Sequence, residues 1–538
     1  MTRASLLGLF CAVILAAQTR PQISFERVRD AGRDPAVWLT YSGEYQATRY
    51  SQAHQINASN VSALRPAWVH QLLDASPPIP GGVRLQVTPL VADGVMYVTL
   101  PRAGVKALDL RTGRQLWSYE HSLSPGVRFS SMANRGAALL DGRLFFGTLD
   151  AYLIALDATS GELLWKTKVA DHQLGYSITS APLALKDKIV TGISGGEFGV
   201  RGFLDAYDPE TGKRLWRFWT IPGPGEPGHE TWKGEAWKTG GGPTWITGSY
   251  DPEANLILWG TGNPSPLFNG DVRPGDNLYT DSLVALDADT GELRWHFQFT
   301  PHDQLDLDAA QIPVLVDRTF GGALRKLVLF ANRNGFFYVL DRLTGEYLLG
   351  KQYGPQTWAK GLDEKGRPIP LPQGQPSTEG SRIVPASGGI TNWNSPSYSP
   401  QTGLLYVAMR EDHATYIKQS DPKYSPGVVY PGGATVEPPE SEKRGAIIAL
   451  SPETGDIVWR TNLQSAPWGG VHATAGGIVF GGTSDGWAFA LDARNGKILW
   501  HFNTGGAIRA NPISFVFEGR QHFSVAAGLS LFSFTLPD

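Results

Sequence analysis

The stretch ALDADTGELRW, residues 285–295, decides the fold because close copies of it return along the whole chain. The other copies are ALDLRTGRQLW (107–117), ALDATSGELLW (155–165), AYDPETGKRLW (206–216), VLDRLTGEYLL (339–349), ALSPETGDIVW (449–459) and ALDARNGKILW (490–500). Each copy predicts two short strands joined by a tight turn, in which Gly supplies the positive φ. The Trp near the end is a large, flat side chain that packs well between neighbouring sheets.

The spacing of the copies indicates a propeller. Gly113, Gly161 and Gly212 follow one another at about 40–50 residues, the repeat length of four-stranded propeller blades. The wider gaps, 212–291 and 345–455, leave room for inserted loops. A degenerate copy ends at Trp68, and we expect the segment 522–535 to complete the sheet begun there. The pattern therefore predicts an all-β fold, an eight-bladed β-propeller with tryptophan-docking motifs, in preference to seven blades.

Charge and cysteine content exclude several function classes. The 538 residues carry a net charge of −3, so nothing indicates nucleic acid or a membrane surface as a partner. The only cysteine is Cys11, and the rest of the chain therefore has no disulfide, no thiolate nucleophile and no CxxCH haem site.

The N-terminus is typical of an exported protein. Arg3 precedes an apolar run over residues 6–17 that ends in two alanines. This pattern predicts a secretory signal at residues 1–19, a single domain over residues 20–538 and a periplasmic location. The run is too short to span a membrane, so we expect no transmembrane segment in the mature chain. The alternative interpretation of the run is a buried N-terminal strand.

Three segments interrupt the repeat, at residues 178–202, 239–266 and 300–341, and functional groups are expected on such loops. They contribute three carboxylates, an amide, a guanidinium and an indole, from Glu197, Asp306, Asp308, Asn263, Arg333 and Trp245. Carboxylate and amide oxygens suit a hard cation such as calcium. No cluster of His or Cys offers a zinc or copper site, and no GxGxxG opens a helix, so a nicotinamide site is not expected.

Each of these residues also has a simpler explanation when it is taken alone. Glu197 can pair with Arg201, and Asn263 before a proline can be a turn residue. Asp306 and Asp308 can be turn caps or solvated acids. If Asp306 and Asp308 lie in an extended strand, both carboxylates point to the same side.

Together the interruptions make the chain recognisable. With SGGEFGVRG (194–202), GTGNPSP (260–266), TPHDQLDLD (300–308) and NRNGFFYVLD (332–341), it resembles the quinoprotein alcohol dehydrogenases. The resemblance covers essentially the whole mature chain. It implies an eight-bladed propeller that holds pyrroloquinoline quinone (PQQ) and a calcium or lanthanide ion in its central funnel.

The resemblance also implies residue roles. The metal ligands are Glu197, Asn263 and Asp306, with Asp308 as an added anionic ligand that favours a lanthanide, although some calcium-using relatives share it. Asp306 is also the general base, Arg333 lies at the reactive carbonyl of the quinone, and Trp245 is the ring on which the cofactor stacks. The remaining cofactor contacts are Gln86, Arg135, Thr179, Ser194, Gly195, Gly196, Asn392 and Trp468. Hydride leaves an alcohol carbon for PQQ, and a separate acceptor such as a cytochrome c reoxidises the cofactor.

The chain departs from the family at several positions. Phe129 and Ser130 stand where many members carry an adjacent Cys pair, and Gln86 replaces a Glu. Pro243 and Leu305 argue against a methanol specialist.

Three functions therefore compete. The first is an exported PQQ-dependent dehydrogenase of an alcohol, polyol or sugar. The second is a non-catalytic propeller scaffold of the outer-membrane assembly type, and the third is a degenerate quinoprotein that binds its cofactor poorly. A scaffold has no need of the polar set in the funnel, which favours the dehydrogenase. The loop 416–445 shapes the substrate entrance, docks an electron carrier or is an ordinary surface loop.

Overall fold

Strands supply nearly all the regular structure in the computed structural model, which describes residues 23–74 and 85–538. The helices of these residues are α1 (Phe25–Arg29) and short 3-10 turns at Ala31–Arg33, Val61–Ala63, His172–Leu174, Gly196–Phe198, His229–Thr231, Ala236–Thr239, Gly270–Val272, Pro372–Gly374 and Glu440–Glu442. No helix in this part of the chain is long and apolar enough to cross a membrane. The prediction of an all-β fold is confirmed, and the predicted signal at residues 1–19 lies outside the described residues.

The strands of the first half form five successive four-stranded antiparallel sheets, each in simple chain order. The first two sheets contain β3 (Leu90–Ala92), β4 (Val95–Leu100), β5 (Gly104–Asp109) and β6 (Gln115–Glu120), then β7 (Ala138–Leu140), β8 (Arg143–Gly147), β9 (Tyr152–Asp157) and β10 (Leu163–Lys168). The next two contain β11 (Leu183–Ala184), β12 (Ile189–Gly192), β13 (Phe203–Tyr207) and β14 (Arg214–Trp219), then β15 (Ser249–Asp251), β16 (Leu256–Gly260), β17 (Ser282–Asp287) and β18 (Leu293–Gln298). The fifth contains β19 (Val314–Phe320), β20 (Ala323–Ala331), β21 (Phe336–Asp341) and β22 (Tyr347–Gln352).

Three further sheets complete the set, and the last joins the two ends of the described chain. The sixth contains β26 (Ser397–Ser399), β27 (Leu404–Glu411), β30 (Arg444–Leu450) and β31 (Ile457–Leu463). The seventh contains β32 (His472–Thr474), β33 (Ile478–Gly482), β34 (Trp487–Asp492) and β35 (Ile498–Asn503), with β1 (Tyr50–Ser51) parallel to β32. The eighth contains β36 (Ile513–Phe517), β37 (Arg520–Ala527), β38 (Ser530–Thr535) and β2 (Arg65–Gln71), so the C-terminal strand completes the sheet of Trp68 as predicted.

Two small sheets lie in the insertions. They contain β23 (Ala359–Leu362) with β24 (Pro368–Pro370), and β25 (Ser381–Ile383) with β28 (Ala414–Lys418) and β29 (Gly433–Val436).

The repeated motif explains how one sheet meets the next. Trp295 on β18 donates its indole N–H to the carbonyl of Arg342, 3.2 Å away in the β21–β22 turn of the following sheet. Gly345 in that turn has a φ of +75°, and a Cβ there would lie 2.5 Å from the Trp295 ring. Glycine therefore serves both the turn and the close approach of the indole.

The same contact recurs around the molecule. Trp rings meet the turn glycine of the next sheet in the pairs Trp68–Gly113, Trp117–Gly161, Trp165–Gly212, Trp216–Gly291, Trp295–Gly345 and Trp459–Gly496. Leu349 replaces Trp against Gly455, and Trp500 donates to the carbonyl of Leu64 just before β2. These contacts link each large sheet to the next and the last sheet to the first, which closes a ring.

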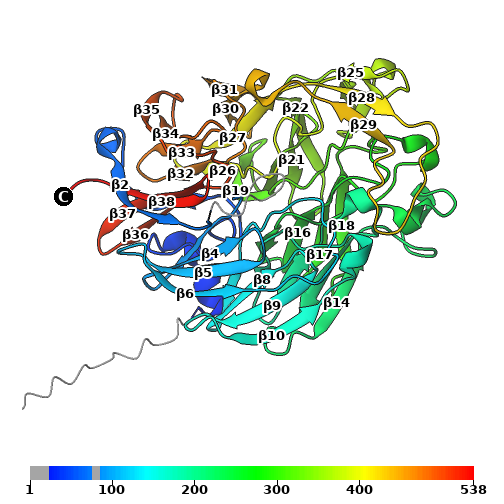
Figure 1. Cartoon of the computed structure of the whole chain (residues 1–538). Coiled ribbons are helices and arrows are strands. Elements are labelled where there is room, and N and C mark those ends of the chain that lie inside the picture. The colour runs from blue at the N-terminus through cyan, green and yellow to red at the C-terminus, as the bar shows by residue number, and fades with distance from the viewer. Residues whose placement is uncertain (1–22, 75–84) are drawn as a thin grey trace, which may run out of the picture.

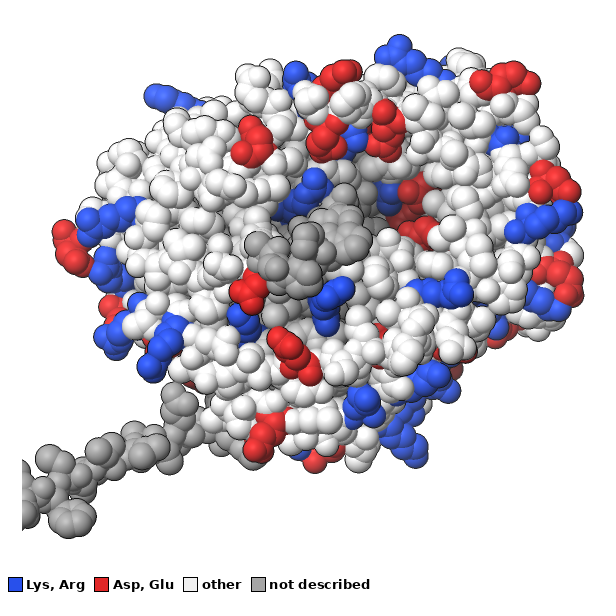
Figure 2. Space-filling view, viewed as in Figure 1, with Lys and Arg blue, Asp and Glu red and all other residues white. Residues whose placement is uncertain are grey.

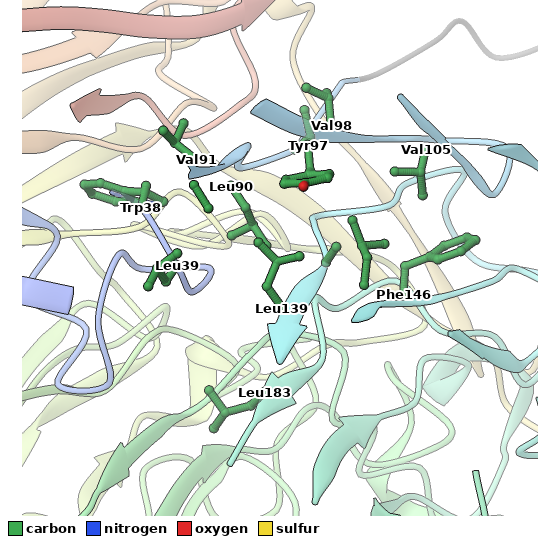
Figure 3. Packing of buried hydrophobic residues seen from close by; sticks show 14 of the residues in the cluster. Trp38, Leu39, Leu90, Val91, Tyr97, Val98, Val105, Leu139, Phe146 and Leu183 are labelled. Carbon is green, nitrogen blue, oxygen red and sulfur yellow. The ribbon is translucent and has the colours of Figure 1, made fainter. Parts of the chain in front are cut away.

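Burial places the fourth strand of a sheet at the rim and the first strand at the centre. The first strand β3 is fully buried, whereas β6 alternates between exposed and half-buried residues. Figure 1 shows β6, β10 and β14 along the lower edge of the molecule. Figure 3 shows Leu90, Leu139 and Leu183, which come from the first strands of three successive sheets, within one core cluster. Neighbouring sheets thus pack face to face through their inner strands.

This topology gathers certain loops at one end of the ring. In an antiparallel sheet the chain enters the first strand at the same end at which it leaves the second. The loops that lead into the first strands and the loops that join second to third strands therefore share one end. All the site residues predicted from the sequence lie on these two kinds of loop.

Candidate active site

Eleven residues singled out from the sequence line one cavity. They are Arg135, Thr179, Ser194, Gly195, Glu197, Trp245, Asn263, Asp306, Asp308, Arg333 and Asn392. Figure 2 shows the viewed face hollowed near its centre, with acidic and basic side chains in the hollow. The ring brings together residues that are far apart in the sequence because each comes from a loop at the same end of its own sheet.

Asp306 and Asp308 reach the cavity from the loop before β19. Leu305 and Leu307 alternate with them and are buried in the hydrophobic core, 2% and 0% exposed. The condition of an extended strand is not met, because no strand covers these residues and Asp306 has a left-handed φ of +62°. Both carboxylates still line the cavity because the buried leucines hold the opposite side of the loop.

Arg333 contacts both carboxylates. Its Nη2 lies 2.8 Å from Asp306 Oδ2, and its Nη1 lies 3.4 Å from Asp308 Oδ1. Its Nε donates to the carbonyl of Ser387 at 2.9 Å. Arg333 is therefore fixed between the two acids and the loop before β26.

Negative charge exceeds positive charge in this part of the cavity. Burial raises the pKa of Asp306 well above its usual value against the opposing effect of Arg333. The carboxylates of Asp308 and Glu197 raise the pKa of Asp306 further. Buried like charges of this kind are costly unless a cation balances them.

Glu197 lies in the 3-10 turn after β12, and burial raises its pKa. The hydroxyl of Ser130 donates to Glu197 Oε2 at 2.5 Å. Arg201, the partner that a purely structural role would require, instead pairs with Glu226 at 2.9 Å. Glu197 is therefore not committed to an ion pair with its neighbour on the loop.

Asn263 directs its amide oxygen towards Gly196, the residue before Glu197. Its backbone N–H donates to Asp308 Oδ1 at 3.1 Å, and its side-chain Nδ2 donates to the carbonyl of Pro264 at 3.1 Å. A Cβ at Gly196 would lie 2.8 Å from Asn263 Oδ1, so glycine is needed where the amide oxygen meets the Glu197 turn.

These donors fit a hard cation. Glu197, Asp306, Asp308 and Asn263 offer only carboxylate and amide oxygens, the ligands that calcium and similar ions prefer. Within residues 23–74 and 85–538 no three His, Asp or Glu side chains are already gathered as a metal cage. The match between these side chains and a hard cation therefore rests on their oxygen donors and on the excess of negative charge.

Trp245 and Arg135 form the other side of the cavity. Trp245 is half-buried, and its indole N–H donates to Asp308 Oδ2 at 2.6 Å. The Arg135 guanidinium lies 4.7 Å from the Trp245 ring and 5.6 Å from the Trp393 ring.

Arg135 has little to balance its charge. It is 2% exposed, its Nε has no hydrogen-bond partner, and burial lowers its pKa to about 10. An aromatic platform beside a buried cation of this kind suits a flat, anionic ligand, and PQQ is a planar tricarboxylate.

Smaller polar groups line the edge of the cavity. Thr179 Oγ1 lies 2.7 Å from Ser194 Oγ, and Gly195 follows with a φ of +123°. Asn392 donates from Nδ2 to the carbonyl of Gly388 at 2.9 Å. These groups supply hydrogen-bonding atoms within reach of a ligand on Trp245.

Three predicted contacts do not line the cavity. Gly196 packs against Asn263 and Pro243, and Trp468 stacks on Trp393 with ring centroids 4.4 Å apart. Gln86 is buried before β3, and its Oε1 has no hydrogen-bond partner.

Sequence reasoning missed Ser131 and Trp393, which line the cavity, and gave Ser130 no role. Trp393 directly follows Asn392, a predicted cofactor contact, and this position in the sequence could have indicated that Trp393 lines the cavity too. Nothing in the sequence indicated the contact between Ser130 and Glu197.

The loop 416–445 reaches the site. The backbone N–H of Tyr430 donates to the carbonyl of Glu197 at 2.6 Å, and the carbonyl of Pro431 accepts from the N–H of Phe268 at 2.8 Å. Val428 and Val429 at its tip are about half exposed, 48% and 55%. The loop is therefore attached to the rim of the cavity and presents apolar side chains to solvent.

Known proteins are similar to this chain in sequence and in fold. The family profile of the glucose/ethanol/alcohol dehydrogenase β-propeller domain, which is named after PQQ, matches residues 38–357. The chain belongs to the PQQ-dependent alcohol dehydrogenases. The fold is thus a propeller, and the protein is an oxidoreductase that acts on an alcohol CH–OH group. A second profile, that of the outer membrane protein assembly factor BamB, matches only residues 443–533.

Similar proteins cover nearly the whole chain of this dehydrogenase. Quinoprotein alcohol dehydrogenase PedH of Pseudomonas putida is 39% identical over 98% of this chain and 93% of its own length. Quinoprotein ethanol dehydrogenase of Pseudomonas aeruginosa is 36% identical, over 98% of this chain and 92% of its own. Among solved structures, quinohemoprotein alcohol dehydrogenase from Comamonas testosteroni has a TM-score of 0.88 at 35% identity, over 95% and 82% of the two chains. A europium-containing methanol dehydrogenase has a TM-score of 0.87 at 33% identity, over 95% and 100%.

Proposed function

We propose that this dehydrogenase oxidises an aliphatic alcohol to its carbonyl, with PQQ on Trp245 and a cation held by Glu197, Asn263, Asp306 and Asp308. The observation that carries the proposal is the contact of Arg333 with both Asp306 and Asp308 inside a buried, acidic cavity. Simple alcohols are favoured over sugars because relatives are named ethanol dehydrogenase and 1-butanol dehydrogenase (cytochrome c).

The residues divide the work of the reaction. When bound, PQQ would supply an electron-accepting quinone, and the cation would supply a Lewis acid. Asp306 accepts the proton of the alcohol hydroxyl, since its carboxylate lines the cavity, and Arg333 holds this carboxylate at 2.8 Å. Arg333 stabilises negative charge that grows beside it. Trp245 and Arg135 orient the cofactor through stacking and through charge.

The proposal also covers the number of blades, the location of the protein and its electron acceptor. The eight large sheets are the eight blades of the propeller, and the Trp–Gly contacts between them are its docking motif. The chain is exported to the periplasm as a single domain over residues 20–538. A separate carrier such as a cytochrome c reoxidises the cofactor, since the sequence has no CxxCH motif of its own.

Reconstitution tests this function. Purified protein freed of metal and cofactor is mixed with PQQ and either lanthanum or calcium, and dye reduction is followed with ethanol, 1-butanol and glucose. We expect alcohol-dependent dye reduction only when both PQQ and a cation are present. Reduction with glucose alone, or none with any alcohol, would contradict the proposed function.

The cation is proposed to be a trivalent lanthanide. Asp308 adds a third carboxylate to the cavity, and the added anionic oxygen is better matched by a charge of three than by calcium. We expect Asp308→Ala to weaken lanthanum binding about 10- to 100-fold, the usual cost of disturbing a metal site, and to change calcium binding less. The affinity of each ion is measured by titration of the metal-free protein. Full activity with calcium alone, unchanged in Asp308→Ala, would make Asp308 an ordinary structural acid.

A further inference from the structure

We propose that Asp303 is a positioning residue that sets the orientation of Asp306; the inference rests on the proposed role of Asp306 as the base. The carboxylate of Asp303 accepts hydrogen bonds from the backbone N–H groups of Leu305 and Leu307, the residues before and after that base. Its Oδ1 accepts from the N–H of Leu305 at 2.9 Å, and its Oδ2 accepts from the N–H of Leu307 at 2.8 Å. Both carboxylate oxygens are therefore used to fold the loop around residue 306.

The hydrogen bonds of Asp303 lie next to an unusual backbone conformation at Asp306. Its φ of +62° is a left-handed conformation that is uncommon for residues other than glycine, although Asp adopts it more readily than most. Asp303 is hydrogen-bonded to the residues before and after Asp306. The Asp303 side chain is only 2% exposed, so water does not compete for these hydrogen bonds. These two hydrogen bonds thus stabilise the turn that directs the Asp306 carboxylate into the cavity.

Asp303 is in turn fixed to the body of the protein. Arg273 is fully buried and donates from Nη2 to the backbone carbonyl of Asp303. The same guanidinium donates from Nε to the carbonyl of Pro266 at 3.0 Å and from Nη1 to Asn277 Oδ1 at 2.9 Å. The loop of the base is therefore tied to the insertion between β16 and β17, which also contains Asn263.

Asp303 does not line the cavity of Asp306 and Arg333, so it acts through Asp306 and not on the substrate. The charge of Asp303 is not what the loop requires, because its partners are backbone N–H groups. What the loop requires is two acceptor oxygens at one position. Asn offers one acceptor oxygen and places an amide N–H₂ where the second is needed.

The test is Asp303→Asn in the full-length protein, with PQQ and a lanthanide bound. We expect kcat per bound cofactor to fall about 10- to 100-fold, the range seen when an outer-shell residue of a metal site is lost, with little change in the KM for the alcohol. Terbium luminescence excited through tryptophan gives a readout without turnover, and we expect terbium affinity to fall by a similar factor. Asp303→Ser, which also offers a single acceptor, serves as the second variant if the Asn protein does not fold.

A matched control is Asp208→Asn. Asp208 also accepts backbone N–H groups, from Glu210 and Thr211 at 3.0 and 2.8 Å, but in a turn at the rim. It is expected to keep the wild-type kcat and terbium affinity.

A double-variant cycle separates this inference from the proposed function. If Asp303 acts through Asp306, Asp303→Asn adds little to the loss already caused by Asp306→Asn. Wild-type kcat and terbium affinity in Asp303→Asn, or in Asp303→Ser where the Asn protein does not fold, would overturn the positioning role. If Asp306→Asn itself keeps full activity, the base assignment fails instead.

Discussion

Asp306→Asn is expected to lower kcat for alcohol oxidation by a factor of about 10²–10⁴, the usual contribution of a positioned general base. The amide cannot accept the hydroxyl proton, although it has nearly the shape of the carboxylate. Asn is chosen over Ala because Asn tolerates the left-handed φ of +62° at this position. The measurement is dye reduction per bound PQQ at saturating alcohol.

The control for this variant is Asp287→Asn, in the turn between β17 and β18. Asp287 also pairs with an arginine, Arg294, at 2.8 Å, but it does not line the cavity. We expect this control to keep the wild-type kcat. Turnover above a tenth of the wild-type value in Asp306→Asn would remove Asp306 as the base.

Arg135→Met is expected to weaken PQQ binding about 100-fold or more while it stabilises the cofactor-free protein. Each charge-assisted hydrogen bond lost to a cofactor carboxylate costs about 1.5–3 kcal/mol. In the free protein the guanidinium is buried with an Nε that has no partner, so replacing it by an apolar side chain is expected to raise the free energy of unfolding by about 1–4 kcal/mol. PQQ titration and chemical denaturation measure the two effects.

Arg217→Met is the control for Arg135→Met, and we expect it to have the opposite effect on stability. Arg217 is also largely buried, but it forms a salt bridge with Asp205 at 2.7 Å. Removing it leaves a buried carboxylate unpaired, and we expect a loss of about 3–5 kcal/mol of stability with no change in PQQ affinity. Unchanged PQQ affinity in Arg135→Met would show that the cofactor carboxylates bind elsewhere.

The repeat made the fold predictable. Alternating apolar residues, a turn glycine and a Trp recur in the sequence because every sheet packs against a similar neighbour. The same regularity made the site predictable, since interruptions of the repeat fall on loops at one end of the ring. Glu197, Asn263 and Arg333 could therefore be singled out before their distances were known.

The details that escaped prediction depend on contacts between distant loops. The left-handed turn at Asp306 is stabilised by the two hydrogen bonds that Asp303 accepts, and no periodic pattern in the sequence predicts them. The hydrogen bond from Ser130 to Glu197 joins loops of two sheets, and a single serine carries no signal of it. Trp393 faces Arg135 only because the loop before β26 turns towards the cavity.

The most direct measurement is a crystal structure of the protein with PQQ and terbium, phased on the anomalous signal of the metal. The account predicts one anomalous peak, coordinated by Glu197, Asn263, Asp306 and Asp308, with the PQQ ring stacked on Trp245. A peak elsewhere in the molecule, or PQQ bound away from Trp245, would contradict it.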